Sequence, residues 1–284
     1  MSRQKTSMHV LDALPAAYFV NGDTGLKKTT TMAWKNKTLQ AEEIAVIVPM
    51  PKAVLDDTDL NLSDISTRIA EAASERIDGA VIFGDGLPST WMTNTAGTSQ
   101  SIIAAATAAG NVVESGTGVD LYDDILGEDG VFAKVEGDRY KVDTWAAEPL
   151  FGARYRHVRV DRTDSAAGAP LFVNADGSGV ARLNGLGGVI VDHNEWDEDK
   201  AILIAGNSRQ LVYAWRQRMD IELFNTGVIN DADGAIMYNL LQQDMVALRV
   251  VMRLGVQIAN PVHRGATVEA NRYPFAVLTP ASGT

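Results

Sequence analysis

The sequence contains no cysteine, so the chain can form neither a disulfide bond nor a metal site built on thiolates, which fits a reducing compartment. Long hydrophobic runs are missing as well, because none approaches the roughly 18 residues that a membrane span requires. The N-terminal candidate, Val10 to Val20, is broken by Asp12 and Pro15. We therefore expect neither a membrane span nor a secretory signal.

Positive charge is in deficit. The chain carries 25 Lys and Arg against 36 Asp and Glu, which gives a formal net charge of −11 and a pI near 4.8. A dedicated nucleic-acid binder needs clustered Lys and Arg to contact phosphates, so this composition argues against one.

Catalytic and metal-binding signatures are absent from the sequence. It has no Gly-x-Ser-x-Gly elbow and no Gly-x-x-x-x-Gly-Lys-Ser/Thr phosphate loop, and its histidines share no spacing typical of metal ligands. The start of a calcium loop is imitated by Asn174, Asp176, Ser178 and Gly179, but Gly185 stands where the loop needs a glutamate. An acidic cluster could bind a divalent ion or a lysine-bearing neighbour, although a solvated helix face is the favoured interpretation. Its members are Asp120, Asp123, Asp124, Glu128 and Asp129.

A strand followed by a helix is the clearest pattern that is present. The 284 residues, 46% of them hydrophobic, suit one large or two modest domains. Ile44 to Pro51 is an apolar strand that its prolines should stop, and an acidic turn follows. Ser63 or Asp64 then caps a helix with an apolar stripe along one side only. This helix ends in Gly84-Asp-Gly, so we expect it to pack along one face.

The first 43 residues look extended. Residues 1–21 carry apolar side chains without a clear period, which predicts an arm that either covers another surface or packs on its own domain. Asn21 to Glu43 reads as a two-stranded excursion, and such a hairpin is marginally stable alone. Its lysines could meet acidic surface on an adjacent copy or form a solvated face. They are Lys27, Lys28, Lys35 and Lys37.

The rest of the chain predicts a second body after a boundary at Leu87 to Gly97. Helices are expected at Ser99 to Ala109 and Val119 to Leu126, and buried strands at Leu186 to Val191 and Ala201 to Ala205. Asp164 to Gly179 is loop-like. The spacing of Arg249, Arg253 and Gln257 taken alone favours a helix over residues 244–256.

The order of several sequence segments resembles that of the major capsid protein of tailed double-stranded DNA phages, which has the Hong Kong 97-type fold. The resemblance rests on Leu39 to Pro51, the acidic turn from Leu55, the helix ending at Phe83-Gly-Asp-Gly86, Gly168 to Phe172, Leu183 to Val191 and Asp244 to Arg253. It implies an α+β fold with an N-terminal arm (1–20), an extended loop (21–43), a peripheral domain with a long spine helix (44–95 and 209–284) and an axial domain (96–208). It also implies a strand, and not a helix, at residues 244–253.

The resemblance implies a structural protein that acts by geometry, without catalysis or cofactor. Copies would assemble into hexamers and pentamers of an icosahedral head in the host cytoplasm, enclosing double-stranded DNA without binding it specifically. An acidic wall would let packed DNA slide, although ordinary solubility explains the charge equally well. A portal protein is the expected partner, with scaffolding or decoration proteins as further ones. The candidates for contact between subunits are Tyr18, Phe19, Lys27, Lys28, Trp34, Lys35, Lys37, Arg68 and Glu75.

Two departures from the family pattern and three alternatives stay open. Some members carry a cleaved N-terminal scaffolding region, whereas this chain begins almost at the arm, so scaffold is separate, absent or already removed. Others cross-link a loop lysine to an asparagine with help from a glutamate; Lys35 or Lys37 lies in the right loop, but no matching asparagine or glutamate is identified. The alternatives are an encapsulin-type nanocompartment shell, a small-molecule α/β enzyme, and a tail or connector protein.

Overall fold

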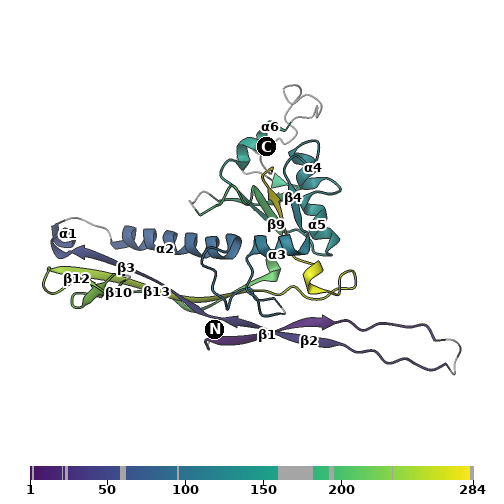
Figure 1. Cartoon of the computed structure of the whole chain (residues 1–284), viewed down its shortest axis with the longest axis horizontal. Coiled ribbons are helices and arrows are strands. Elements are labelled where there is room, and N and C mark those ends of the chain that lie inside the picture. Colours follow the sequence, from purple (N-terminus) through teal and green to yellow (C-terminus); the bar gives the residue numbers. More distant parts are fainter. Residues whose placement is uncertain are drawn as a thin grey trace. The chain divides into compact units, whose positions relative to one another are not determined.

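A computed structural model describes residues 1, 3–20, 22, 25–57, 62–94, 96–158, 182–191, 195–231 and 233–281. Its contacts divide the chain into two compact units, both of which are drawn in Figure 1. The first unit comprises Met1–Thr6, Leu39–Ile77 and Tyr213–Val256, and the second comprises Ser7–Thr38, Asp78–Val212 and Gln257–Thr284. The chain therefore passes between the units repeatedly, and each unit is built from segments that are distant in sequence.

The first unit is built on a three-stranded sheet in the order β10-β13-β3. Strand β13 (Met245–Ile258) lies in the centre and pairs antiparallel with β3 (Glu42–Pro51), from Met245 opposite Pro51 to Leu254 opposite Glu42. Strand β10 (Leu211–Phe224) forms the other edge. The strand ends at Pro51, as expected, whereas Pro49 does not stop it and stays paired with Ala247. An edge strand tolerates proline because one side of its backbone needs no partner.

Residues 245–258 form a strand, as the resemblance implied, and the helix suggested by the spacing of the arginines is wrong. A spacing of four residues fits either structure, because it places side chains on one face of a strand as well as on one face of a helix. Burial decides between them: Val246, Leu248 and Val250 are buried, whereas Arg249 is exposed. That alternation has the period of a half-buried strand.

Helix α2 (Leu62–Asp78) lies along one face of this sheet, as Figure 1 shows, and confirms the predicted one-sided stripe. Ile65 and Ile69 pack against Met50 and the buried side of β13. The helix already begins at Leu62, so Ser63 and Asp64 lie in its first turn and the predicted cap is wrong. The acidic turn before it contains a short helix, α1 (Lys52–Asp57). After α2 the chain continues as a π-helical turn, η1 (Gly79–Phe83), which ends at Gly84 with a positive φ of 87°.

The second unit contains a five-stranded sheet in the order β4-β14-β9-β5-β8. Strand β14 runs parallel to β4 and antiparallel to β9, and β5 runs antiparallel to β9 and parallel to β8. The strands are β4 (Val112–Glu114), β5 (Thr144–Ala147), β8 (Val189–Ile190), β9 (Leu203–Gly206) and β14 (Phe275–Thr279). The core of this unit joins the sheet to neighbouring helices through Trp145, Phe151, Ile125, Val135 and Leu203.

The helices of the second unit confirm the two predicted ones. Ser99 to Ala109 contains α3 (Ile102–Ala109), capped by the Ser101 side chain, and Val119 to Leu126 contains α4 (Leu121–Leu126). Two further short helices are α5 (Val131–Gly137) and α6 (Phe151–His157). The turns η2 (Ser208–Gln210) and η3 (Glu269–Asn271) complete the helical elements of the described residues.

The predicted buried strand at Leu186 to Val191 is wrong in part. It is divided into β7 (Leu186–Gly187), which pairs with β6 (Arg182–Leu183), and β8, whose Val189 is exposed. Gly188 separates β7 from β8 and leaves room for the Trp145 ring, because a Cβ there would lie 2.0 Å from that ring. The expected strand at Ala201 to Ala205 is confirmed by the buried β9. The predicted loop, the Gly168 to Phe172 phrase and the calcium-like turn at Asn174 lie outside the described residues.

The division into units differs from the boundaries drawn on the sequence. The second unit includes the chain from Asp78 onward, which is before the expected boundary at residues 87–97. It also includes residues 7–38 and 257–284, and the sequence assigned residues 257–284 to the peripheral domain. Pairing explains the second difference, since β14 adds to the sheet between β4 and β9. A further hairpin, β11 (Val228–Asn230) with β12 (Ile236–Asn239), belongs to the first unit.

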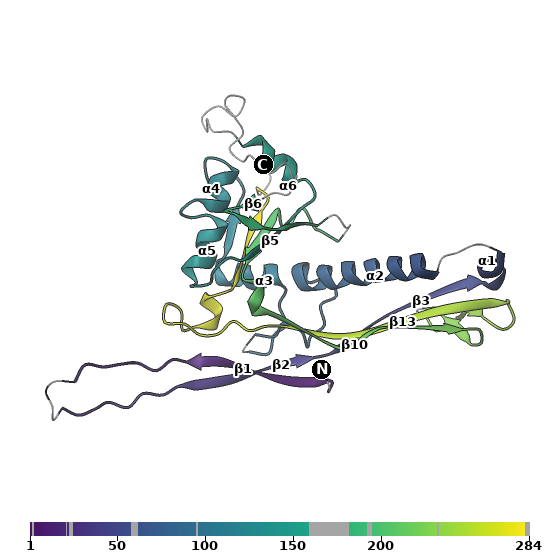
Figure 2. The same ribbon diagram turned by 180° about the vertical axis from the view of Figure 1, so that it is seen from behind.

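The described residues between Lys5 and Gln40 lie together in one long hairpin. Strand β1 (Lys5–Ala13) pairs with β2 (Ala33–Gln40), so the predicted arm supplies the first strand of the predicted excursion. Residues 14–20 and 25–32 then continue side by side beyond these strands, as Figures 1 and 2 both show. A hydrogen bond from the Ala16 amide to Thr30 Oγ1, at 2.9 Å, joins the two extensions.

Candidate subunit interface

The outer part of the hairpin carries large apolar side chains that the described chain leaves in solvent. Phe19 is 108% exposed, Leu26 90%, Trp34 60% and Tyr18 53%. Covering one such side chain contributes about 1.5–3 kcal/mol, so this segment gains free energy when another surface covers it. Contiguous exposed apolar groups on a folded protein are typical of a binding surface. Leu26 was missed in the sequence because it lies beside charged residues without a strand period.

The lysines of the hairpin divide into two groups. Lys27 and Lys28 are exposed, and Lys28 Nζ lies 5.3 Å from the centre of the Tyr18 ring. Lys35 is half-buried. Lys28 therefore places positive charge beside the exposed Tyr18 ring.

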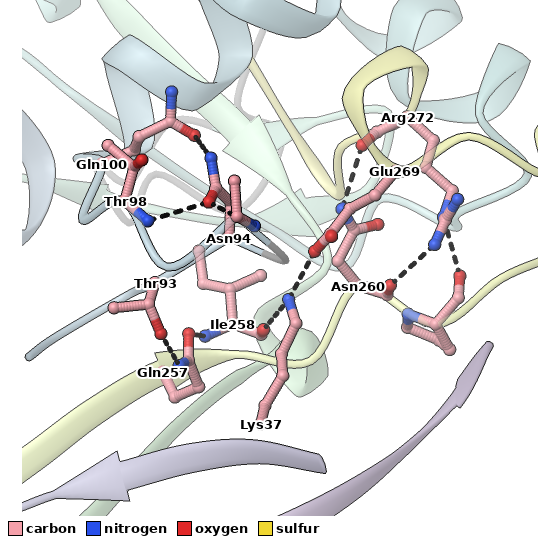
Figure 3. A network of polar contacts seen from close by, with 12 residues as sticks. Lys37, Thr93, Asn94, Thr98, Gln100, Gln257, Ile258, Asn260, Glu269 and Arg272 are labelled. Carbon is pink, nitrogen blue, oxygen red and sulfur yellow. Dashed lines mark hydrogen bonds and ion pairs between the residues drawn. The ribbon is translucent and has the colours of Figure 1, made fainter. Parts of the chain in front are cut away.

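Lys37 is different, because it is buried and paired within its own unit. Its Nζ lies 2.7 Å from Glu269 Oε1 and donates to the Ile258 carbonyl at 3.0 Å, as Figure 3 shows. Burial lowers the pKa of Lys37 from its usual value, although the Glu269 carboxylate opposes that shift. The contact of Lys37 with a neighbouring subunit stays a prediction, and this pairing within the subunit argues against it. Nothing local in the sequence indicates this, since Glu269 is 232 residues away (269 minus 37).

Polar contacts surround Lys37 and adjoin a cavity of about 240 Å³. Gln257, with no exposed surface, donates from Nε2 to the Thr38 carbonyl and to Thr93 Oγ1, both at 3.1 Å. The Arg272 guanidinium donates to the backbone carbonyls of Asn260, Pro261 and Ala266. Figure 3 shows these side chains converging at the inner end of the hairpin. The base of the hairpin is thus held by directional hydrogen bonds.

The charged side of helix α2 holds the two other predicted contact residues. Arg68 is well exposed and lies 3.0 Å from Glu71 Oε2 and 3.9 Å from Asp64 Oδ1, one turn away in either direction. Glu75 is half-buried on the same helix. Exposed pairs of this kind add little stability, so these side chains stay accessible for contacts with a partner.

Two apolar surfaces of the first unit were not found in the sequence. A groove of about 380 Å³ lies between α2 and β10, lined among others by Ala73, Ile77, Trp215 and Met219. The β11–β12 hairpin and the turn after it expose a second group, which comprises Val228, Ile236, Met237 and Leu241. The apolar residues that alternate along β10 could have predicted the apolar side of this groove.

The described residues contain no group of His, Cys, Asp or Glu that could hold a metal ion. Within the acidic cluster, Asp120 caps α4 through the amides of Tyr122 and Asp123. The buried Asp124 accepts from the amides of Gly116 and Gly118, at 2.8 and 2.7 Å. These carboxylates therefore order a loop and a helix end. No described helix is long and apolar enough to cross a membrane.

Comparison with known proteins places this geometry in a family. The model of the phage capsid family matches residues 3–262. The chain belongs to the phage capsid family. A curated relative, the major capsid protein of Staphylococcus phage 80alpha, is 26% identical over 261 residues, which are 87% of this chain and 69% of that protein.

Solved structures support the same assignment. One from Microbacterium phage Oxtober96 is 32% identical, with a TM-score of 0.84 over 99% of this chain and 87% of the other. One from Mycobacterium phage Adephagia is 27% identical, with a TM-score of 0.82 over 100% and 87%. The fold is thus α+β of the Hong Kong 97 type, as the resemblance implied.

The function follows from family membership. The chain is a structural shell protein, with the role of a phage major capsid protein, and the nanocompartment and enzyme alternatives are less well supported. Capsid proteins of this family assemble with copies of themselves into a shell, so the chain is a component of the virion.

Proposed function

We propose that copies of this chain form the hexamers and pentamers of an icosahedral head that encloses double-stranded DNA, and that assembly takes place in the host cytoplasm. The observation that carries the proposal is the hairpin beyond β1 and β2, whose apolar side chains reach 108% exposure at Phe19. A segment of this kind gains stability when neighbours cover it.

In this proposal the long hairpin corresponds to the family's extended loop and the first unit to the peripheral domain. The five-stranded sheet and its helices correspond to the axial domain. Contacts between subunits are carried by the outer hairpin and by the charged side of α2. The proposed residues are Tyr18, Phe19, Lys27, Lys28, Trp34, Lys35, Arg68 and Glu75. We add Leu26 because it is exposed, and we leave out Lys37 because it is buried and paired within its own subunit.

The chain acts by geometry and carries no catalytic activity in this proposal. Its net charge of −11 keeps packaged DNA from adhering to the wall, so the DNA is enclosed without specific binding. A portal protein occupies one position in the shell, and scaffolding or decoration proteins are further partners.

Sizing of the expressed chain, followed by negative-stain microscopy, tests the proposal. We expect megadalton icosahedral particles, and particles purified from infected cells should contain double-stranded DNA. A compact monomer or dimer at every concentration would contradict assembly, and enzyme cargo in place of a genome would favour a nanocompartment.

A further inference from the structure

The base of the hairpin is held by one short stretch of chain, residues 257–272, on both of its strands. On β1, the Leu11 carbonyl accepts a hydrogen bond from the Val262 amide at 2.9 Å. On β2, the Thr38 carbonyl accepts from Gln257, and Lys37 donates to the Ile258 carbonyl. All of these residues belong to the second unit, so this attachment lies within one unit.

Lys37 and Glu269 form the ionic part of this attachment. Their side chains are 8% and 14% exposed, so both charges are largely removed from water. A buried ion pair adds little net stability compared with apolar side chains of similar volume, because desolvation offsets the attraction. Stability alone therefore does not account for the pair. An ion pair with hydrogen-bond geometry also fixes the relative orientation of its two side chains, which apolar packing does not do.

The direction in which the hairpin leaves its base matters because the hairpin is long, so a small rotation at the base displaces the outer end by a large distance. Residue 25 lies 12 positions beyond Lys37 (37 minus 25), which spans up to about 40 Å at about 3.3 Å per residue. A rotation of about 10° at the base then moves the outer end by about 7 Å, more than the width of one side chain. The cavity beside Lys37 and Glu269 leaves room for a second arrangement of these side chains.

We propose that the Lys37–Glu269 ion pair is a latch that fixes the direction in which the hairpin leaves the second unit, and that a closed latch is needed to place the hairpin on a neighbouring copy. The second part rests on the proposed function, in which the hairpin crosses onto a neighbour. The latch itself is a property of the single subunit.

Hydrogen exchange on dissociated full-length subunits tests the latch. The variant Lys37→Met keeps the aliphatic length and removes the charge, and Lys5→Met makes the same change at an exposed residue of β1. We expect the amides of β2 and of Val262 to exchange about tenfold faster in Lys37→Met than in the original chain. The thermal midpoint should fall as well, because the buried Glu269 carboxylate loses its partner. Lys5→Met and the charge-conserving Lys37→Arg should exchange like the original chain.

These outcomes distinguish an ion pair that orients the hairpin from one that only contributes to the stability of the fold. The latch proposal is overturned if exchange at the hairpin base is unchanged in Lys37→Met, or if the loss of protection is spread evenly over both units. If Lys37→Met does not fold, Glu269→Gln provides the same comparison, because it removes the partner charge and keeps a hydrogen-bond acceptor.

Assembly of the same variants tests the second part. We expect Lys37→Met to yield particles of variable diameter and incomplete shells, whereas Lys37→Arg yields uniform ones. Faster exchange together with normal particles would overturn the link between latch and shell. Failure of the proposed function is recognised separately, because the original chain itself would then form no shells, whatever hydrogen exchange shows at the hairpin base.

Discussion

Replacing Phe19 and Leu26 together by serine removes the two most exposed apolar side chains of the outer hairpin, at 108% and 90% exposure. Burial of each in an interface contributes about 1.5–3 kcal/mol, so the pair contributes about 3–6 kcal/mol per subunit. The lower end of this range corresponds to a roughly 100-fold rise in the subunit concentration at which shells form. The folded subunit itself should lose almost nothing, because neither side chain is buried within it.

The assay is light scattering of subunits across a concentration series, with electron microscopy of the products. Val119→Ser serves as the control, because Val119 is 72% exposed but lies outside the hairpin. We expect the control to assemble at the original threshold and the double variant to stay dissociated there. Assembly of the double variant at the original concentration would refute the reasoning that the hairpin is covered by a neighbour.

Three further predictions concern the single subunit and are checked by chemical denaturation. Trp145→Ala should lower the free energy of unfolding by about 3–5 kcal/mol, because the ring fills the core against Phe151, and a loss below about 1 kcal/mol would contradict the packing. Glu43→Gln should cost less than about 1 kcal/mol, since Glu43 and Arg253 pair at the surface, and a larger loss would be inconsistent with that exposure. Burial raises the pKa of Glu148 despite the Arg154 guanidinium, so the folded state holds this proton more tightly than the unfolded state. The stability of the original chain relative to Glu148→Gln should therefore be greatest below about pH 4.5 and fall as pH rises through the folded pKa; a flat difference would refute the assignment.

Local patterns in the sequence were enough to predict the helices and strands whose buried side chains recur with the period of that helix or strand. The apolar stripe of α2, the alanine-rich α3 and the apolar β9 were all found in this way. Strand β13 shows the limit of that approach. A spacing of four residues fits both a helix and a strand, and only the burial of the individual side chains distinguishes the two. The order of the phrases, read as a family resemblance, supplied the correct structure.

Features that depend on distant residues could not be predicted. The pairing of β1 with β2 needs a partner strand that begins 20 residues after β1 ends (33 minus 13), and β1 itself shows no strong alternation. Lys37 looked like its neighbours in the charged loop, and only Glu269 distinguishes it. Tyr18, Phe19 and Trp34 are exposed in the described chain, and their contacts with a neighbouring subunit stay a prediction.

A cryo-electron microscopy reconstruction of assembled particles tests the central claim most directly, because it shows what covers the outer hairpin. The account predicts that Phe19 and Leu26 lie buried against another copy of the chain while Lys37 stays paired with Glu269 of its own subunit. A hairpin folded back onto its own subunit, or one that extends into solvent with both apolar side chains uncovered, would contradict it.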